Sequence, residues 1–241
     1  DLLKHDTFRA AVTGGSLFRI GTGAIPFLLP LMLQIGFGLD PLHSGLITFA
    51  AAAGALLIKI VGPRILRAHG FRRVMVTNAL VAAAFLAANG LFTAETPHWI
   101  IVSVLLLGGC VRSLQFTCVN AIAYADLDSR EMSAATSLAS VAQQLSLSLG
   151  VSIGALALEG AASWHGHSGI EAGDFPLAFL AVSVISAGSF FVFRRLAPDA
   201  GSEVSGQRRV AEAVPRPADG SPQSLAPITP RHAPEPGRPS A

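Results

Sequence analysis

Two long apolar segments decide the fold of this chain: HWIIVSVLLLGGCVRSLQFTCVNAIAY at residues 98–124 and MSAATSLASVAQQLSLSLGVSIGALAL at residues 132–158. A short charged hinge, ADLDSRE at 125–131, joins them. Because a helix turns about 100° per residue, side chains three or four positions apart share one face. That face carries Gly108, Arg112, Gln115, Phe116 and Val119 on the first segment, and Ser133, Ser137, Ser140, Gln144 and Ser148 on the second. Neither segment has enough charge to face water, so we expect both faces to point inward.

The composition indicates a membrane protein. Hydrophobic residues form 51% of the 241 residues and charged residues only 13%, with a mean hydropathy of +0.54, whereas soluble domains carry about 25% charged residues. A helix needs about 20 apolar residues to cross the hydrocarbon. Six segments meet that length: 12–36, 43–61, 74–93, 98–124, 132–158 and 175–193. The sequence therefore predicts an all-α membrane protein with a bundle of six transmembrane helices.

The placement of lysine and arginine predicts the orientation of these spans. Outside the spans, both residue types occur only before the first span, between spans two and three, between spans four and five, and after the sixth. Cytoplasmic loops carry the excess of positive charge, so we expect both termini in the cytoplasm. The predicted domains are a cytoplasmic lead-in at 1–11, the six-span bundle at 12–196 and a disordered cytoplasmic tail, rich in Pro, Gly and Ser, at 197–241. The chain opens DLLK without a signal-peptide pattern, and we expect a piece cut from a longer protein.

Several stretches resemble a known family of transporters. They are LPLMLQ at 29–34, PRILRAHGFRR at 63–73, and SLQFTCVN at 113–120 followed by 133–154. Together they look like the C-terminal six spans of a major facilitator superfamily transporter, and most resemble the fourteen-span, proton-coupled multidrug efflux antiporters. The loop at 63–73 is similar to the superfamily's loop motif. Gly70, Arg72 and Arg73 match its second glycine and its basic pair, whereas Pro63 stands at the first glycine and Arg67 at the acidic position.

The resemblance implies a particular machine and particular partners. Such a transporter has two six-helix bundles, each made of inverted three-helix repeats, with the substrate between them. The missing N-terminal bundle, a small-molecule substrate, protons and the lipid bilayer are therefore the expected partners, in what we expect to be a bacterial inner membrane. No cofactor, metal or nucleic acid is expected, and the chain is not expected to be an enzyme. No Asp or Glu lies at the centre of a predicted span, so we expect the coupling carboxylate outside this chain.

Seven polar residues within the spans are the candidates for a substrate cavity: Arg19, Gln34, Arg112, Gln115, Asn120, Ser140 and Gln144. An arginine at a helix centre costs about 2.5–3.5 kcal/mol of insertion free energy, so each one needs a reason. Arg112 lies near mid-span, and we expect it to line the cavity. Arg19 lies closer to the predicted cytoplasmic side, and we expect its side chain to reach toward the headgroups.

Two other functions compete with transport. GHSG at 166–169 matches a serine-protease string, but a rhomboid-like enzyme needs its serine at a buried helix start beside a histidine, and Ser168 falls in a predicted outer loop. A non-transporting scaffold or assembly subunit would need no aligned polar faces. His165 and His167 are expected to be solvated side chains of the same outer loop.

Overall fold

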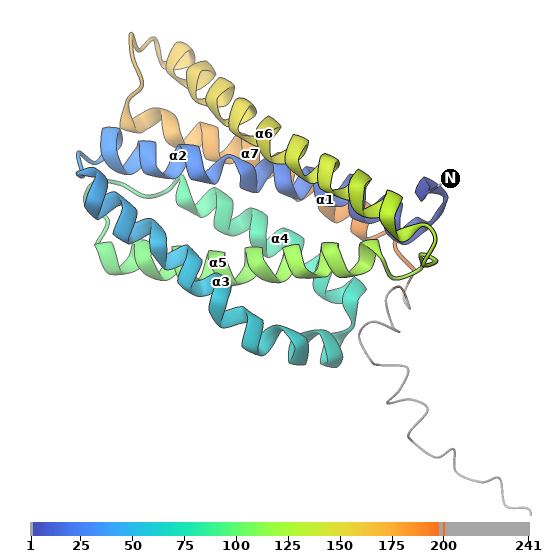
Figure 1. Ribbon diagram of the computed structural model, residues 1–241. Coiled ribbons are helices and arrows are strands. Elements are labelled where there is room, and N and C mark those ends of the chain that lie inside the picture. The colour runs from blue at the N-terminus through green and yellow to red at the C-terminus, as the bar shows by residue number, and fades with distance from the viewer. Residues whose placement is uncertain (1, 198–199, 201–241) are drawn as a thin grey trace, which may run out of the picture.

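The computed structural model describes residues 2–197 and 200, and within them six helical stretches are long and apolar enough to cross a membrane. These stretches are Asp6–Gly36, Pro41–His69, Phe71–Asn89, His98–Ala123, Met132–His165 and Ala172–Phe193. The predicted six-span helical bundle is thus confirmed (Figure 1). The predicted tail at 197–241 lies outside the described residues except for 197 and 200.

The first span is built from three consecutive pieces. α1 covers Asp6–Gly23, α2 covers Ile25–Leu31, and a π-helical turn, η2, covers Met32–Gly36. Pro26 lies in the first turn of α2 and Pro30 lies inside it. A proline removes a backbone donor and disturbs the regular helix, which accounts for the division of this span.

The other long helices are α3 (Pro41–His69), α4 (Phe71–Asn89), α5 (His98–Ala123), α6 (Met132–His165) and α7 (Phe175–Phe193). Two short 3₁₀ turns accompany them, η1 (Leu2–Lys4) at the start and η3 (Ala172–Asp174) just before α7. α1 begins six residues before the predicted first span, and α6 continues seven residues beyond the predicted end of the fifth, Leu158. At 1.5 Å per residue the 29-residue α3 is about 44 Å long. The longest helices therefore exceed the hydrocarbon thickness of about 30 Å.

The prediction of a basic loop between spans two and three is wrong. α3 continues through Pro63 to His69, and α4 begins at Phe71, so only Gly70 separates the two helices. Gly70 has φ 76° and ψ 157°, a conformation that side chains with a Cβ rarely adopt. The chain therefore turns at this single glycine, and the basic residues around it belong to helix ends.

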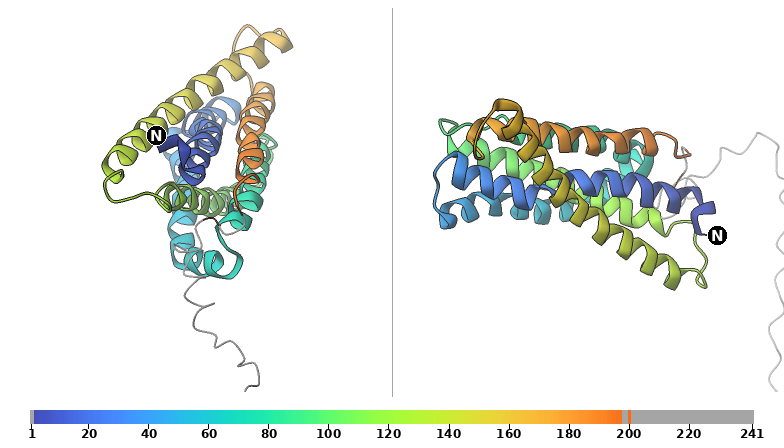
Figure 2. Two further views of the ribbon diagram at one scale, coloured as in Figure 1. Left: turned by 90° about the vertical axis from the view of Figure 1, so that its right-hand side faces the viewer. Right: turned by 90° about the horizontal axis from the view of Figure 1, so that it is seen from above.

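The helix packing divides the bundle into two related halves. α1 packs against α6 and α7, while α5 packs against α3 and α4. If α1, α3 and α4 are exchanged with α5, α6 and α7, in that order, the contacts of α1 become the contacts of α5. Three crossings in each half also place the two halves in opposite orientations across the membrane, as inverted repeats require. α6 crosses α1 obliquely at the edge of the bundle (Figure 2).

The N-terminus, the α3–α4 junction, the α5–α6 hinge and the end of α7 lie at one end of the bundle (Figure 1). His5 Nε2 lies 3.3 Å from Glu131 Oε2 in the hinge, and Arg72 Nη2 donates to the Arg194 carbonyl at 3.0 Å. The same end carries the basic residues on which the predicted orientation rests. The α6–α7 connection lies at the opposite end.

Candidate functional site

A cavity of about 240 Å³ lies between α1, α5 and α6. We call it the Arg19 cavity. Three of the seven predicted candidates, Arg19, Asn120 and Ser140, line it from three different helices. The remaining lining residues are Ala11, Val12, Val119, Ala123, Tyr124, Ala139, Ala142 and Gln143. The structure thus gathers polar groups that are up to 124 positions apart in the chain, counting from Arg19 to Gln143.

Arg19 is the most deeply held polar group of this cavity. Its side chain is only 5% exposed, and its Nη2 donates a hydrogen bond of 2.8 Å to Asn120 Oδ1. The guanidinium carbon also lies 5.6 Å from the centroid of the Phe116 ring, within the range of a cation–π interaction. The expectation that Arg19 reaches toward the headgroups is therefore wrong. Partners on α5 hold the guanidinium inside the bundle.

The Arg19 guanidinium retains a donor for a further partner. Its Nε is buried and has no hydrogen-bond acceptor among the described residues. An unsatisfied buried donor costs free energy unless a partner reaches it. The fork of Arg19 can therefore donate to a carboxylate or another acceptor that reaches it.

Gly15 makes room for this arrangement on α1. A Cβ at Gly15 would lie 2.6 Å from Val119 Cγ1 and 2.7 Å from Arg19 Nη1. Gly15 precedes Arg19 by four residues, one helical turn, so the two share a face. A glycine one turn before an intramembrane arginine was the sequence signal that could have indicated an inward-facing guanidinium.

Arg112 lies elsewhere, in a recess of about 30 Å³ among α1–α5, which we call the Arg112 recess. Its side chain is half-buried, near Thr22, Phe85 and Asn89. No hydrogen bond or ion pair joins it to any residue that the structure describes. A volume of this size is about that of one water molecule, so the recess cannot hold a drug-sized substrate. The structure does not bring the two arginines into one site.

The prediction that Gln115 lines a cavity is wrong. Its side chain is 0% exposed, and its Oε1 accepts a 2.9 Å hydrogen bond from Asn78 Nδ2. Its Nε2 donates to the Met75 carbonyl at 3.2 Å, and Asn78 also donates to the Val111 carbonyl at 2.8 Å. Buried polar groups need such partners. Gln115 therefore ties α5 to α4, and both polar atoms of its buried amide have partners within the bundle.

Gln34 and Gln144 are both exposed and do not line the Arg19 cavity. Gln34 lies in the π-helical turn at the end of the first span. The whole polar row of α6 is likewise exposed: Ser133, Ser137, Ser140, Gln144 and Ser148. Within the described bundle, this row points outward, and only Ser140 borders the Arg19 cavity. The expectation that this face of α6 points inward is therefore wrong for the six helices described.

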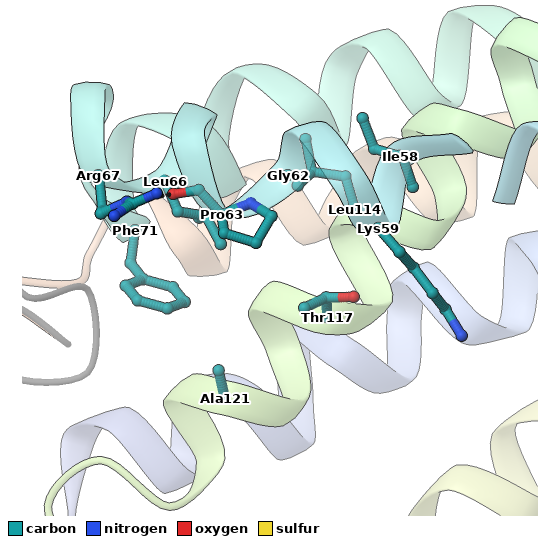
Figure 3. A pocket seen from close by; sticks show the side chains of 10 residues that line it. All are labelled: Ile58, Lys59, Gly62, Pro63, Leu66, Arg67, Phe71, Leu114, Thr117 and Ala121. Carbon is teal, nitrogen blue, oxygen red and sulfur yellow. Dashed lines mark hydrogen bonds between the residues drawn. The ribbon is translucent and has the colours of Figure 1, made fainter. Parts of the chain in front are cut away.

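The residues of the loop motif lie at the basic end of the bundle. A groove of about 490 Å³ between α3 and α5 is lined there by Pro63 and Arg67, together with Lys59, Leu114, Thr117 and Phe71 of α4 (Figure 3). Arg67 Nε donates to the Pro63 carbonyl at 3.3 Å. Arg72 joins the start of α4 to the end of α7 through the Arg194 carbonyl. Arg73 is exposed. Arg67 and Arg72 therefore bond to backbone carbonyls near helix ends.

The bundle of six helices with an internal three-span repeat defines the class of an α-helical multispan membrane protein, an architecture found in many secondary transporters. A family model described as "Major Facilitator Superfamily" matches residues 11–234. The chain belongs to this superfamily, and the resemblance expected from its sequence is confirmed. The family implies a transporter rather than an enzyme. Ser168, the residue of the protease string, is exposed in the α6–α7 connection and does not start a buried helix.

The chain is also similar to curated proteins of enterobacteria. It is 37% identical over 200 residues to the "Putative multidrug resistance protein MdtD" of Pectobacterium atrosepticum, covering 82% of this chain and 43% of that protein. It is 33% identical over 214 residues to the protein of the same name from Escherichia coli O6:H1, covering 86% of this chain and 45% of that protein. The chain spans less than half the length of these relatives. No solved structure matches it significantly.

Proposed function

We propose that this chain is the C-terminal half of a secondary active transporter that exports drugs or other amphipathic small molecules by alternating access. The observation that carries the proposal is the Arg19 cavity, in which a buried guanidinium, Asn120 and Ser140 converge between three membrane-spanning helices. The names of the relatives support a drug as the substrate. In the whole protein the cavity would form one wall of the substrate path.

The missing N-terminal bundle is the proposed neighbour of the exposed polar row of α6. Polar side chains rarely face lipid, and they mark helix contacts or water-filled paths in membrane proteins. The hydroxyls of Ser137 and Ser152 bond to carbonyls of their own helix at 3.1 and 3.3 Å. No hydrogen bond from the described residues reaches the amide of Gln144. A second bundle packed beside α6 would supply partners, and rocking of the two bundles would open the cavity to each side in turn.

Proton flux is the proposed driving force, and the missing bundle is the proposed source of the coupling carboxylate. The acidic residues of the six helical stretches lie near their ends: Asp6, Glu159 and Asp174. None of them lines the Arg19 cavity. The free Nε of Arg19 is the group to which a carboxylate from the other bundle would bind. Protonation of that carboxylate would release the pair and couple proton entry to the change of state.

The basic end of the bundle is proposed to face the cytoplasm of a bacterial inner membrane, with both termini on that side. The positive-inside rule supports this orientation. A cysteine at exposed Ala68, after removal of Cys110 and Cys118, should resist an impermeant thiol reagent in intact cells. A cysteine at Gly169 should react.

The experiment for the proposed function uses the full-length protein reconstituted into lipid vesicles. A fluorescent cationic dye is supplied outside or inside, and a pH gradient of either direction is imposed. The proposal predicts dye movement that follows the pH gradient and stops when an ionophore collapses it. Dye movement that ignores the gradient would reject proton coupling, and no dye movement by a correctly folded protein would reject drug export.

A further inference from the structure

A cluster of ligand-type side chains lies at the other end of the molecule, in the connection from α6 to α7. His165 ends α6, His167 follows two residues later, and Asp174 directly precedes α7. His165 Nδ1 donates to Asp174 Oδ1 at 2.7 Å, and His167 Nδ1 lies 3.0 Å from the same oxygen and 3.1 Å from Oδ2. We call these three residues the outer histidine cluster. The sequence predicts that both histidines are solvated, whereas in the structure both contact Asp174.

Asp174 is the centre of this cluster and is completely buried, with 0% of its side chain exposed. Its Oδ2 also accepts a hydrogen bond of 2.9 Å from the Glu171 backbone N–H. The carboxylate further lies at the N-terminus of α7, where the helix dipole favours negative charge. The carboxylate of Asp174 is thus buried between two imidazoles. The end of α6 and the start of α7 hold these groups in place.

The donor set matches the preferences of a divalent transition metal. The ligand atoms of His165, His167 and Asp174 all lie within 4.8 Å of one another. Zinc–nitrogen and zinc–oxygen bonds of about 2.0–2.2 Å place neighbouring ligands roughly 3.3 Å apart in a tetrahedron. The observed separations of 2.7 Å and 3.0 Å need only a small outward movement of the two rings. Each imidazole would move its proton to Nε2, so that the Nδ1 lone pair faces the ion.

A second carboxylate completes the arrangement. Glu171 Oε2 lies 3.5 Å from His167 Nε2. Metal-bound histidines usually donate their other N–H to a carboxylate, which fixes the tautomer and the ring orientation. The side chain of His165 is 35% exposed and that of His167 is 26% exposed, so an ion has a path from the solvent.

We propose that the outer histidine cluster binds one zinc-type divalent transition metal ion through His165 Nδ1, His167 Nδ1 and the Asp174 carboxylate. Glu171 orients His167, and the fourth position of the ion remains open to water. The bound ion fastens the end of α6 to the start of α7 on the side opposite the basic end. This site is independent of the Arg19 cavity and of the transported substrate.

The chain offers a matched control at the N-terminus of α3, where Asp40 is the N-cap and His43 lies in the first turn. His43 Nδ1 lies 2.7 Å from Asp40 Oδ2, as short as the His165 contact, but this pair has one histidine and both side chains are more than half exposed. The N–H of His43 also lowers the pKa of Asp40 by hydrogen bonding to its carboxylate. A His–Asp contact alone therefore does not distinguish the two places. Only the outer histidine cluster offers two nitrogens and a buried carboxylate.

The test uses the full-length protein with an affinity tag that contains no histidine. The protein is stripped of metal, titrated with ZnCl₂ by calorimetry, and assayed for bound zinc after gel filtration. We expect one zinc per chain, at least about tenfold weaker binding in His165→Ala and in Asp174→Asn, and unchanged binding in His43→Ala and Asp40→Asn. Co²⁺ should give the visible absorption of a four-coordinate site in the parent protein and in the two control variants, but not in His165→Ala or Asp174→Asn.

Folding is checked by gel filtration and thermal unfolding without metal. His165→Ala is the decisive variant because its partly exposed ring can be removed with less damage than buried Asp174. Absence of stoichiometric zinc from the parent protein would overturn the proposal and leave a cluster held by hydrogen bonds alone. Equal zinc binding by folded His165→Ala would overturn it as well.

Discussion

Arg19 and Arg112 are the same residue type inside the same bundle, but their surroundings differ. Arg19 is 5% exposed and is held by Asn120 at 2.8 Å and by the face of Phe116, beside a cavity of about 240 Å³. Arg112 is half-buried, occupies a recess of about 30 Å³ and has no partner among the described residues. Depth along a helix therefore does not decide which arginine lines the larger cavity. The rotational position of the side chain relative to neighbouring helices does.

The sharpest way to break this comparison is to make the same substitution at both arginines. Arg19→Met removes a charge-assisted hydrogen bond worth about 1.5–3 kcal/mol, so dye efflux by the full-length protein should fall about tenfold or more. Arg112→Met should lower it less than about twofold, because the Arg112 recess cannot hold a substrate. Efflux is normalised to protein in the membrane. A larger loss at Arg112 than at Arg19 would reverse the assignment.

Asn120 tests whether the position of Arg19 matters as well as its charge. Asn120→Ala removes the acceptor of the 2.8 Å bond and should lower efflux several-fold, less than the loss of the guanidinium itself. The double variant with Arg19→Met should be no worse than Arg19→Met alone, because two residues of one interaction are not additive. Independent, additive losses would show that the hydrogen bond has no functional role.

Gly15 tests the space around the guanidinium. Gly15→Ala places a methyl group within 2.7 Å of Arg19 Nη1 and should lower efflux by a few-fold by displacing the side chain. Gly160→Ala on α6 is the matched control, because a Cβ there meets nothing within 4 Å, and it should have no effect. Normal efflux by Gly15→Ala would mean that the guanidinium can move without loss of function.

Gln115 is expected to have the smallest effect on transport. Its amide bonds to Asn78 and to the Met75 carbonyl inside the bundle, so Gln115→Ala should lower stability by about 1 kcal/mol, typical of hydrogen bonds between membrane helices. The pattern of drugs exported should not change. Thermal unfolding in detergent and a panel of drug susceptibilities measure the two properties. An altered pattern of exported drugs with unchanged stability would indicate that Gln115 contacts the substrate.

The sequence predicts the membrane-spanning segments well. It predicts poorly which neighbouring helix each side chain faces. Apolar segments of about 20 residues have few alternatives in a bilayer, so all six were found. The α3–α4 junction was missed because basic residues at a helix end and in a loop look alike in sequence, and only the positive φ of Gly70 distinguishes them. Arg19, Asn120 and Ser140 were each identified as candidates. Their convergence depends on how α1, α5 and α6 pack, and a single sequence does not contain that information.

Gln115 and the outer histidine cluster both show that the sequence does not reveal partners on other elements. Gln115 shares a helical face with Arg112, but its amide forms hydrogen bonds with Asn78 and Met75 of α4. His165 and His167 lie in a polar stretch, but buried Asp174 draws both rings together. In each case a partner on another element decides the role of the residue, and the sequence of the residue's own helix or loop does not show that partner.

The most direct test of the Arg19 cavity is substrate protection of a cysteine placed in its wall. Ser140→Cys is introduced into the full-length protein after Cys110, Cys118 and any further cysteines are replaced, with Leu145→Cys as a control that is exposed on α6 but does not line the cavity. Thiol labelling is followed in membranes with and without a transported dye. The dye should slow the labelling of the cysteine at position 140 and leave the labelling at position 145 unchanged. Equal labelling of position 140 with and without the dye would contradict it.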